Sequence, residues 1–346
     1  MHRSLVLLGL LALSLPASAQ ELDFAVDQAA SDFTWSGTTS LGPLVGDPSN
    51  AFELSGNQAL TLAAGAGGAL WSGAFTSGDL AVVPDLHGKI PNPLPFLPPL
   101  ATVRVTNLHL SLSSPAFDVA GSGAFTAQVT ATVLSGTMTV VSIAGNSVVD
   151  LAGNTTAASA QSGTILAGTG LALTVPVNVT FPFDDPTSGV SGSLSTSGVL
   201  HADWSAPAPT VYCTAKLTSG GCLPAIATSG TPSASAPGGF ALEVTQVEPF
   251  NLGLFFYSAS GPAAVPFLGG TLCLGGGITR LPPSSAGGAG PCSGQYTADF
   301  NAYLAASQPA LRVPGQAFWA QCWFRDPPAA VGASGLSDAA AFVLAP

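Results

Sequence analysis

The sequence predicts an all-β protein: two antiparallel β-sandwich or barrel-like domains that follow a cleaved signal peptide. Among its 346 residues, Gly and Pro number 41 and 29, hydrophobic residues make up 47% and charged residues 7%. This composition favours many short strands joined by turns over a disordered chain. Apolar and polar residues alternate repeatedly in the first half, as they do on strands with one buried face. No segment shows a sustained helical period with capping residues, so any helices are expected to be short.

The first twenty residues, "MHRSLVLLGLLALSLPASAQ", have the features of a secretory signal. Arg3 provides a positive start, an apolar run covers 5–15, and small residues at 17–19 form a cleavage site. The run is shorter than the roughly 20 residues that span a bilayer, and no later stretch is long and apolar enough. We therefore expect a signal peptide at 1–19 and a secreted chain, extracellular or associated with the cell surface, that begins near Gln20 and has no transmembrane segment.

The first domain is predicted to be an acidic antiparallel β domain over residues 20–204. Its longest alternating segment is "LALTVPVNVTFPF", 171–183, in which the Leu, Val and Phe side chains all fall on one face. Pro176 and Pro182 fall on the other face. Because proline has no N–H to donate to a ladder, we expect this strand at the edge of a sheet.

Three further segments of this domain predict local irregularities. In "TVRVTNLHLSL", 102–112, the apolar pattern changes phase near Asn107, as a β-bulge would cause. The segment "AFTAQVTATVLSGTMTVVS", 124–142, predicts a strand, a Ser-Gly turn and a second strand. The stretch "KIPNPLPFLPPL", 89–100, predicts a long loop or a crossover, and its alternative function is that of a proline-rich recognition ligand.

A Pro/Ala linker, "SAPAPT" at 205–210, precedes a cysteine-containing β-sandwich module predicted over 211–346. The first domain has thirteen acidic residues against Lys89 and Arg104, whereas the module has five against four basic residues. With six basic residues in the mature chain and no cluster of them, nucleic-acid binding has no electrostatic basis. We therefore expect no nucleic-acid partner and look instead to an extracellular polymer or a cell-surface component.

All five cysteines lie in the second module, and in an exported protein such clustering indicates a disulfide framework. Because five is odd, at least one thiol has no partner within the chain. Neighbouring cysteines flank short polar or Gly-rich segments, so the simplest prediction pairs Cys213 with Cys222 and Cys273 with Cys292. Cys322 lies on an apolar strand face and is then predicted to be a buried free thiol.

A series of motifs in the second module is specific enough to indicate a family. In order, they are "VYCT", "GGC", "GTPSAS", "GLFFYSASGPAAVPFLGGTLCL", "CSGQYTADFNAY", "FRDP" and "GLSDAAAF". In these motifs the module resembles a C-terminal β-rich module of secreted proteins from planctomycete-like bacteria. The resemblance implies a recurrent β-sandwich attached to varied N-terminal partners, with no catalytic residues assigned to it. Many such modules carry a cysteine just before the final proline, where this chain has Ala345, and this departure offers a reason for the odd cysteine count.

Motifs that carry enzymatic chemistry are missing from the sequence. It has no G-x-S-x-G elbow, no G-x-x-x-x-G-K-[ST] loop, no H-E-x-x-H and no C-x-x-C. Asp85 lies two residues before His87, and His201 two before Asp203, so each pair would share a strand face. Such pairs could orient an imidazole for Ser-His-Asp chemistry or bind a metal. We interpret them, with His109, as polar residues on the outer faces of strands.

Adjacent acids and scattered aromatic residues are weaker candidates for ligand sites. Asp184 and Asp185 in "FPFDDPTSG" could bind Ca²⁺ through hard oxygen ligands, but Asp-Asp-Pro equally begins a turn. Exposed tryptophans could stack on sugar rings, although alternating apolar neighbours favour burial of each one. The candidates are Trp35, Trp71, Trp204, Trp319 and Trp323. We predict no metal and no cofactor.

The densest group of reactive residues is "AQCWFRDPP", 320–328. It continues an alternating strand with apolar residues on both faces, which Pro327 and Pro328 end. Arg325 and Asp326 then fall at the strand exit, where their side chains could bond the carbonyls and amides of a turn. A catalytic Arg-Asp pair would need a base nearby, and this module has no histidine. We predict that both residues brace the turn.

Together these features predict a non-enzymatic exported protein with an extracellular structural, display or interaction role. The alternative is a carbohydrate- or small-apolar-ligand-binding protein, because a closed barrel of this size can hold a cavity in the first domain. Exposed aromatic residues would favour that alternative. A secreted hydrolase comes third and would require carboxylates or histidines that converge in one cleft.

Overall fold

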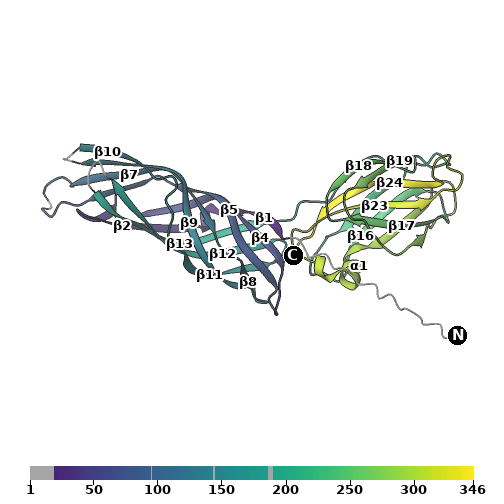
Figure 1. Cartoon of the computed structure of the whole chain (residues 1–346), viewed down its shortest axis with the longest axis horizontal. Helices are drawn as coiled ribbons and strands as arrows, with labels where there is room; N and C mark the ends of the chain where they lie inside the picture. The colour runs from purple at the N-terminus through teal and green to yellow at the C-terminus, as the bar shows by residue number, and fades with distance from the viewer. Residues whose placement is uncertain (1–18, 95, 143–144, 186–189) are drawn as a thin grey trace, which may run out of the picture.

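The computed structural model describes residues 19–94, 96–142, 145–185 and 190–346 of the chain. Except for Ala19, the predicted signal peptide lies outside the described residues. Strands take up 62% of the chain and helices 4%, with large antiparallel sheets, so the all-β prediction is confirmed. Figure 1 shows two β-rich modules joined end to end, with the C-terminus near their junction. In the described part of the chain, no helix has the length and apolarity needed to cross a membrane.

The N-terminal module consists of thirteen strands that form one sheet. In chain order they are β1 Gln20–Val26, β2 Asp32–Thr39, β3 Gly42–Gly46, β4 Ala51–Ala64, β5 Trp71–Val83, β6 Leu86–Ile90, β7 Ala101–Ser113, β8 Phe117–Val119, β9 Ala124–Ser142, β10 Gly145–Asp150, β11 Ser159–Ala167, β12 Leu171–Asp185 and β13 Val190–Trp204. A 3-10 turn, η1 Gln28–Ala30, joins β1 to β2 and is capped by Asp27, whose carboxylate accepts the Ala30 N–H. Alternate side chains of each strand point inward, which gives the sheet one apolar face.

The sheet closes on itself because β9, which has 19 residues, is paired on both flanks. One flank pairs with β7 and β8. The other pairs with β11 near Ala124 and with β10 near Ser142. The remaining strands lead from β11 through β12, β13 and β1 to β4 and β5, and through β2, β3 and β6 to β7. The inward faces therefore surround a single apolar core.

This circuit is open along one seam, between β10 and β12. β12 pairs with β13 over its whole length but with β11 only from Leu171 to Thr174. Among the described residues, no ladder joins the rest of β12 to β10. Pro176 and Pro182 lie in this part of the strand, so the edge prediction holds there. It is wrong for the start of β12, where β11 covers the flank.

Two predicted irregularities of the N-terminal module have different outcomes. The β-bulge is confirmed, because the register of β7 on β9 shifts between Thr106 and His109, and Asn107 adopts a φ of 52°. The predicted Ser-Gly turn is wrong, because β9 runs unbroken through Ser135 and Gly136. On one side His109 of β7 pairs with Ser135, and on the other the Leu151 N–H donates to the Gly136 carbonyl at 2.9 Å, so the chain stays extended here.

The C-terminal module contains a six-stranded sheet, a three-stranded sheet and a two-stranded hairpin. Its strands are β14 Thr210–Tyr212, β15 Ala225–Gly230, β16 Phe240–Val247, β17 Leu252–Ser258, β18 Pro262–Phe267, β19 Gly270–Leu274, β20 Thr279–Arg280, β21 Ser284–Ser285, β22 Gly294–Asp299, β23 Ala317–Arg325 and β24 Ser334–Val343. Helix α1, Phe300–Ser307, is capped by the Asp299 carboxylate and is followed by the 3-10 turn η2, Pro309–Leu311. The core of this module includes aromatic rings in mutual contact: Phe240, Tyr257, Phe300, Phe318 and Phe342.

The predicted pairing of neighbouring cysteines is wrong. Disulfides join Cys213 to Cys273 and Cys222 to Cys292, over sequence separations of 60 and 70 residues. The physical reason is a turn between the first two cysteines, closed by the Thr218 N–H on the carbonyl of Cys222 at 2.9 Å. The chain therefore leaves Cys213 beside β19 and carries Cys222 to the loop before β22. Closure of such long loops stabilises a fold by roughly 4 kcal/mol for each bridge.

The two modules share a buried junction. Val313, between η2 and β23, is 1% exposed and packs in the core of the N-terminal module. Gly315 approaches β1 so closely that a Cβ built there would lie 2.1 Å from Leu22 Cδ2. Beside it, the Gln20 side-chain amide donates to Gln316 Oε1 at 3.3 Å. The C-terminal module therefore packs directly against the end of the N-terminal core, in addition to its Pro/Ala linker.

The fifth cysteine provides a test of the disulfide framework. Cys322 is free and fully buried on β23, and burial raises the pKa of its thiol well above the ordinary value. Because the thiolate is the nucleophile, we predict that iodoacetamide modifies Cys322 only after denaturation. Peptide mapping without reduction should find Cys213 linked to Cys273 and Cys222 linked to Cys292. Rapid modification of Cys322 in the folded protein, or linkage of neighbouring cysteines, would contradict this framework.

Candidate functional site

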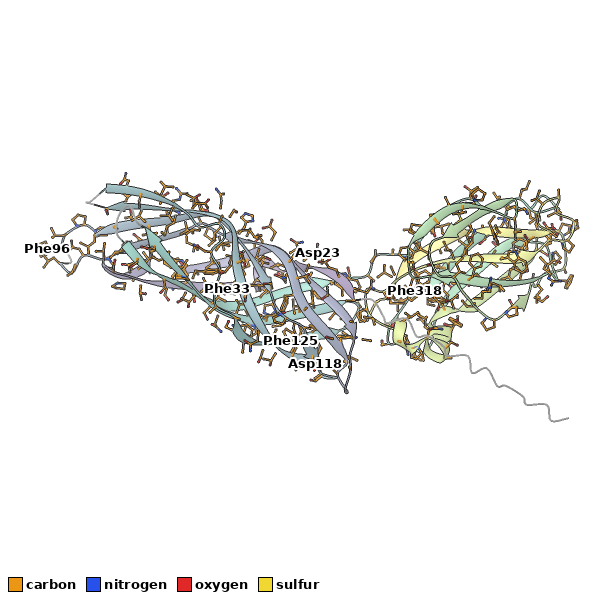
Figure 2. The ribbon with its side chains drawn as sticks, in the orientation of Figure 1. Asp23, Phe33, Phe96, Asp118, Phe125 and Phe318 are labelled. Carbon is orange, nitrogen blue, oxygen red and sulfur yellow. A yellow bond between two sulfur atoms is a disulfide. The ribbon has the colours of Figure 1, made fainter. Side chains whose placement is uncertain are left out.

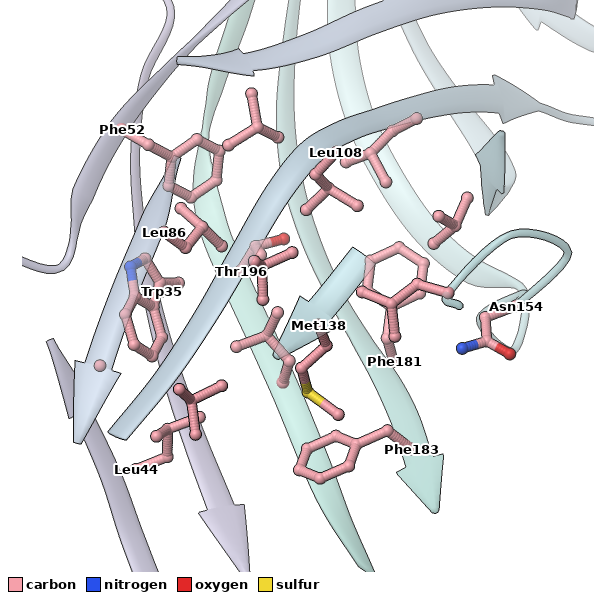
Figure 3. A pocket seen from close by; sticks show the side chains of 18 of the residues that line it. Trp35, Leu44, Phe52, Leu86, Leu108, Met138, Asn154, Phe181, Phe183 and Thr196 are labelled. Atoms are coloured by element: carbon pink, nitrogen blue, oxygen red, sulfur yellow. The ribbon is translucent and has the colours of Figure 1, made fainter. Parts of the chain in front are cut away.

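The strongest candidate for a ligand site is an apolar cavity inside the N-terminal module, next to the seam between β10 and β12. Its volume is about 40 Å³. Figure 3 shows its wall, to which β12 contributes Phe181 and Phe183, β9 contributes Met138 and β2 contributes Trp35. The two phenylalanines occupy alternate positions of β12, so both rings lie on the inner face of the strand.

The lining of this cavity determines what it could hold. Apart from the indole N–H of Trp35, its polar side chains are those of Asn154, in the loop after β10, and Thr196 of β13. Among the described residues, no acidic, basic, histidine or cysteine side chain lines it. A guest would therefore be uncharged and apolar, held by dispersion and by the exclusion of water.

The volume limits the size of any guest. A dry cavity of about 150 Å³ in a protein core binds benzene, and this cavity has roughly a quarter of that volume. A larger apolar ligand would require the rings of Phe181 and Phe183 to move, or the seam beside them to open. The N-terminal module is therefore a filled body in this conformation, with space for little more than a few small atoms.

Asp85 and His87, interpreted from the sequence as polar residues on an outer strand face, are not bonded to each other in the described structure. Asp85 accepts from the Arg104 guanidinium at 3.2 Å and from the Asn107 N–H at 3.3 Å. His87 lies exposed on β6, opposite Arg104 of β7. The carboxylate therefore braces the bulge of β7 and does not orient an imidazole.

The other two histidines lie on separate, partly exposed strand faces. His201 Nδ1 is 3.4 Å from the Thr174 hydroxyl, while Asp203 is exposed. His109 Nδ1 lies 2.5 Å from Asp79 Oδ1 across β7 and β5, with side chains 36% and 60% exposed. This last pair was missed in the sequence, because its members are 30 residues apart and only the β5–β7 register brings them together.

The tryptophans offer little surface for stacking on a sugar. Trp35 and Trp71 are 3% and 7% exposed, so both belong to the core of the N-terminal module. Trp204, Trp319 and Trp323 are partly exposed, and two of these lie in the C-terminal module. Of the three candidate tryptophans in the N-terminal module, Trp204 is the one with a partly exposed side chain.

Two groups of side chains offer possible metal ligands. Asp184 is exposed at the end of β12, and the side chain of Asp185 lies outside the described residues. Cys222, Glu248 and Cys292 bring three ligand atoms within 4.8 Å of one another. Because a disulfide joins the two sulfurs, neither is available as a thiolate ligand.

At the exit of β23, one of the two predicted residues braces the turn. Asp326 is fully buried, and its carboxylate accepts from the Ser219 N–H at 2.7 Å and from the Ser219 hydroxyl at 2.5 Å. Arg325 is exposed, and its guanidinium has no partner among the described residues. The predicted bracing role of Arg325 is therefore wrong. Successive side chains of a strand point to opposite sides, so Arg325 faces solvent where Asp326 faces inward.

Lys216 supplies the cation that was expected from Arg325. Its Nζ donates to the carbonyls of Leu268 at 2.7 Å, Val331 at 2.7 Å and Ser334 at 2.6 Å. These bonds tie the β18–β19 hairpin to the loop between β23 and β24. The sequence contains no local signal for this role, because the acceptors are 52 to 118 residues away.

Substitutions at the exit of β23 separate these two roles. We predict that Asp326→Ala lowers the free energy of unfolding by about 1.5 to 3 kcal/mol, because the donors of Ser219 lose a buried charged acceptor. Arg325→Ala should change it by no more than about 0.5 kcal/mol, as for other exposed residues. Urea unfolding of the mature protein measures both. Equal losses for the two variants would show that the brace is not the Asp326 carboxylate.

Comparison of the chain with protein-family models gave no match, and neither curated proteins nor solved structures gave one. Function is therefore inferred from the geometry of the molecule itself.

Proposed function

We propose that this chain is a non-enzymatic exported protein that acts as a rigid extracellular spacer and displays an interaction surface at its far end. The observation that carries this proposal is the combination of a filled N-terminal interior with a buried junction between modules. A carrier needs a hollow interior, whereas a spacer needs a filled and stiff one.

The junction supports the spacer role. Inter-domain motion is the default expectation when modules are joined by a linker alone. Here Val313 is buried in the core of the N-terminal module, and Gly315 lies against Leu22 of β1. Rotation about the linker would therefore expose a buried valine. The two modules should therefore move as one body.

Export is supported by the signal-like N-terminus and by the two disulfides, which persist in oxidising compartments. The motif resemblance of the C-terminal module to modules of secreted proteins points in the same direction. An extracellular polymer, a cell-surface component or a second copy of the chain would be the partner.

The surface displayed is the loop between β6 and β7, residues 91–100. Figure 2 labels Phe96 at the end of the N-terminal module that is farthest from the C-terminal module. Phe96 is 79% exposed, and Leu94 and Leu97 are 50% and 45% exposed. Exposed apolar groups gathered at one place on a protein are typical of an interaction site.

Binding of a small apolar ligand is the second candidate, supported by the cavity beside the seam. The volume of about 40 Å³ favours the filled body over a carrier. A hydrolase is not favoured, because the contact of His109 with Asp79 lies on a partly exposed strand face, apart from His87 and His201.

Small-angle X-ray scattering tests the spacer proposal. Extrapolated to low concentration, the mature chain should scatter as one rigid elongated particle. Gly315→Ala places a methyl group against Leu22 and should separate the modules, with a larger radius of gyration and a flexible profile. Gly153→Ala is the matched control, because Gly153 has a φ of +83° against +82° at Gly315 and no atom within 4 Å of the added carbon. A flexible profile for the wild type, or identical profiles for all three proteins, would contradict the proposal.

A further inference from the structure

The C-terminal module carries an open apolar groove, here called the Trp323 groove. One wall is the face of the six-stranded sheet, with Leu254, Phe256 and Trp323, and the other is the β18–β19 hairpin, with Phe267, Leu268 and Leu272. Its volume is about 390 Å³, nearly ten times that of the N-terminal cavity. Phe267 and Leu268 are 39% and 38% exposed, so the groove is accessible to a partner.

One cation lies in this groove without a partner. Arg280, on the short edge strand β20, lines the groove and is exposed. Among the residues that the structure describes, its guanidinium takes part in no ion pair and no side-chain hydrogen bond. The groove therefore offers five N–H donors beside an aromatic wall, a combination suited to an apolar segment that presents carbonyl oxygens.

The loop at 91–100, here called the tip loop, has the complementary chemistry. Its sequence, "PNPLPFLPPL", has no charged residue and five prolines, which contribute carbonyl acceptors but no N–H. The Leu100 N–H is bonded to Ile90 O at 2.9 Å and the Leu97 N–H to Leu94 O at 3.0 Å. The loop thus has many free hydrogen-bond acceptors and few free donors. The Arg280 guanidinium, in contrast, has five N–H donors and no acceptor.

The tip loop is also held in shape before any partner arrives. The Leu94 N–H donates to Asn92 Oδ1 at 3.0 Å, and the Asn92 amide donates to Pro98 O at 3.2 Å. These bonds hold described residues on either side of Phe96, which is 79% exposed, while residue 95 lies outside the described residues. A preformed aromatic projection loses little conformational entropy when it enters a groove.

The two surfaces cannot meet within one molecule. The tip loop lies at the far end of the N-terminal module, and the β18–β19 hairpin lies in the other module, beyond the junction (Figures 1 and 2). The buried contacts of Val313 and Gly315 prevent the chain from folding back. We propose that the tip loop of one copy docks in the Trp323 groove of a second copy, with Phe96 against its aromatic wall and Arg280 on the loop carbonyls.

This contact joins two different surfaces, so it is heterologous. Heterologous contacts continue from copy to copy and build open chains unless the rotation closes a ring. The N-terminal module as a whole carries thirteen acidic residues against two basic ones, although the tip loop itself is uncharged. The same excess of acid disfavours approach of the tip to an anionic lipid surface.

The inference deepens the spacer proposal and rests on it, since a flexible junction would let the chain fold back. Its test is sedimentation velocity of the mature protein as a function of concentration. The wild type should show a series of oligomers that grows with concentration. Phe96→Ser, which removes the projecting ring, and Arg280→Glu, which replaces donors with acceptors, should each weaken association at least tenfold.

Mixing the two variants gives the sharpest result. The Phe96→Ser copy keeps an intact groove, and the Arg280→Glu copy keeps an intact tip loop. An equimolar mixture should therefore form a one-to-one dimer and nothing larger, at concentrations where neither variant alone associates. Phe250→Ser is the control for loss of an exposed ring, because Phe250 is 73% exposed outside both surfaces, and it should assemble like the wild type.

Several outcomes would overturn the inference. A wild type that stays monomeric at every accessible concentration would do so, as would a mixture of variants without a dimer. Binding of the monomer to phosphatidylcholine vesicles, lost in Phe96→Ser and kept in Arg280→Glu, would assign the tip loop to a lipid surface instead. A rigid scattering profile combined with a monomeric wild type would leave the spacer proposal standing and remove the self-association.

Discussion

The fold of the N-terminal module depends on the pairing of β9 along both of its flanks. This strand supplies the contacts that turn a thirteen-stranded sheet into a closed body, because β7 and β8 lie on one side of it and β10 and β11 on the other. Closure removes edges that would otherwise pair with other chains. It also fixes which side chains face inward, so the aromatic and aliphatic rows of β2, β5 and β12 meet in one core. The seam beside β12 is the place where closure is incomplete, and prolines protect that edge.

Local features of the sequence predicted those parts of the structure that local chemistry determines. Alternation located the strands, and a phase change of apolar residues located the bulge at Asn107. Contacts between residues far apart in the sequence were not predictable, because the pairing of the strands brings them together. They are the disulfide of Cys213 with Cys273, the contact of His109 with Asp79 and the three carbonyls bound by Lys216. Arg325 and Asp326 were predicted as a pair, but the strand pleat places only one of them inside. The cavity beside the seam depends on the order of the strands in the sheet, so it could not be predicted from the sequence either.

The two modules carry different features of the molecule. The N-terminal module has a filled interior and carries an uncharged, braced loop at its far end. The C-terminal module carries the open groove and the disulfides, and Val313 fixes it to its neighbour. A stiff connection gives both surfaces a defined separation and orientation, as a spacer or a repeating assembly requires. In the proposed spacer role, stability and function are linked, because the buried junction around Val313 also keeps the loop and the groove apart.

Native-state hydrogen exchange of the mature protein tests this account of the closed sheet most directly. Backbone amides of β9 should be among the slowest, with exchange only through global unfolding, because both flanks of the strand are paired. Amides of β12 beyond Thr174 that point toward the seam should exchange much faster than those that point toward β13. Uniform protection along β12, or rapid local exchange in β9, would contradict a sheet closed at β9 and open at this seam.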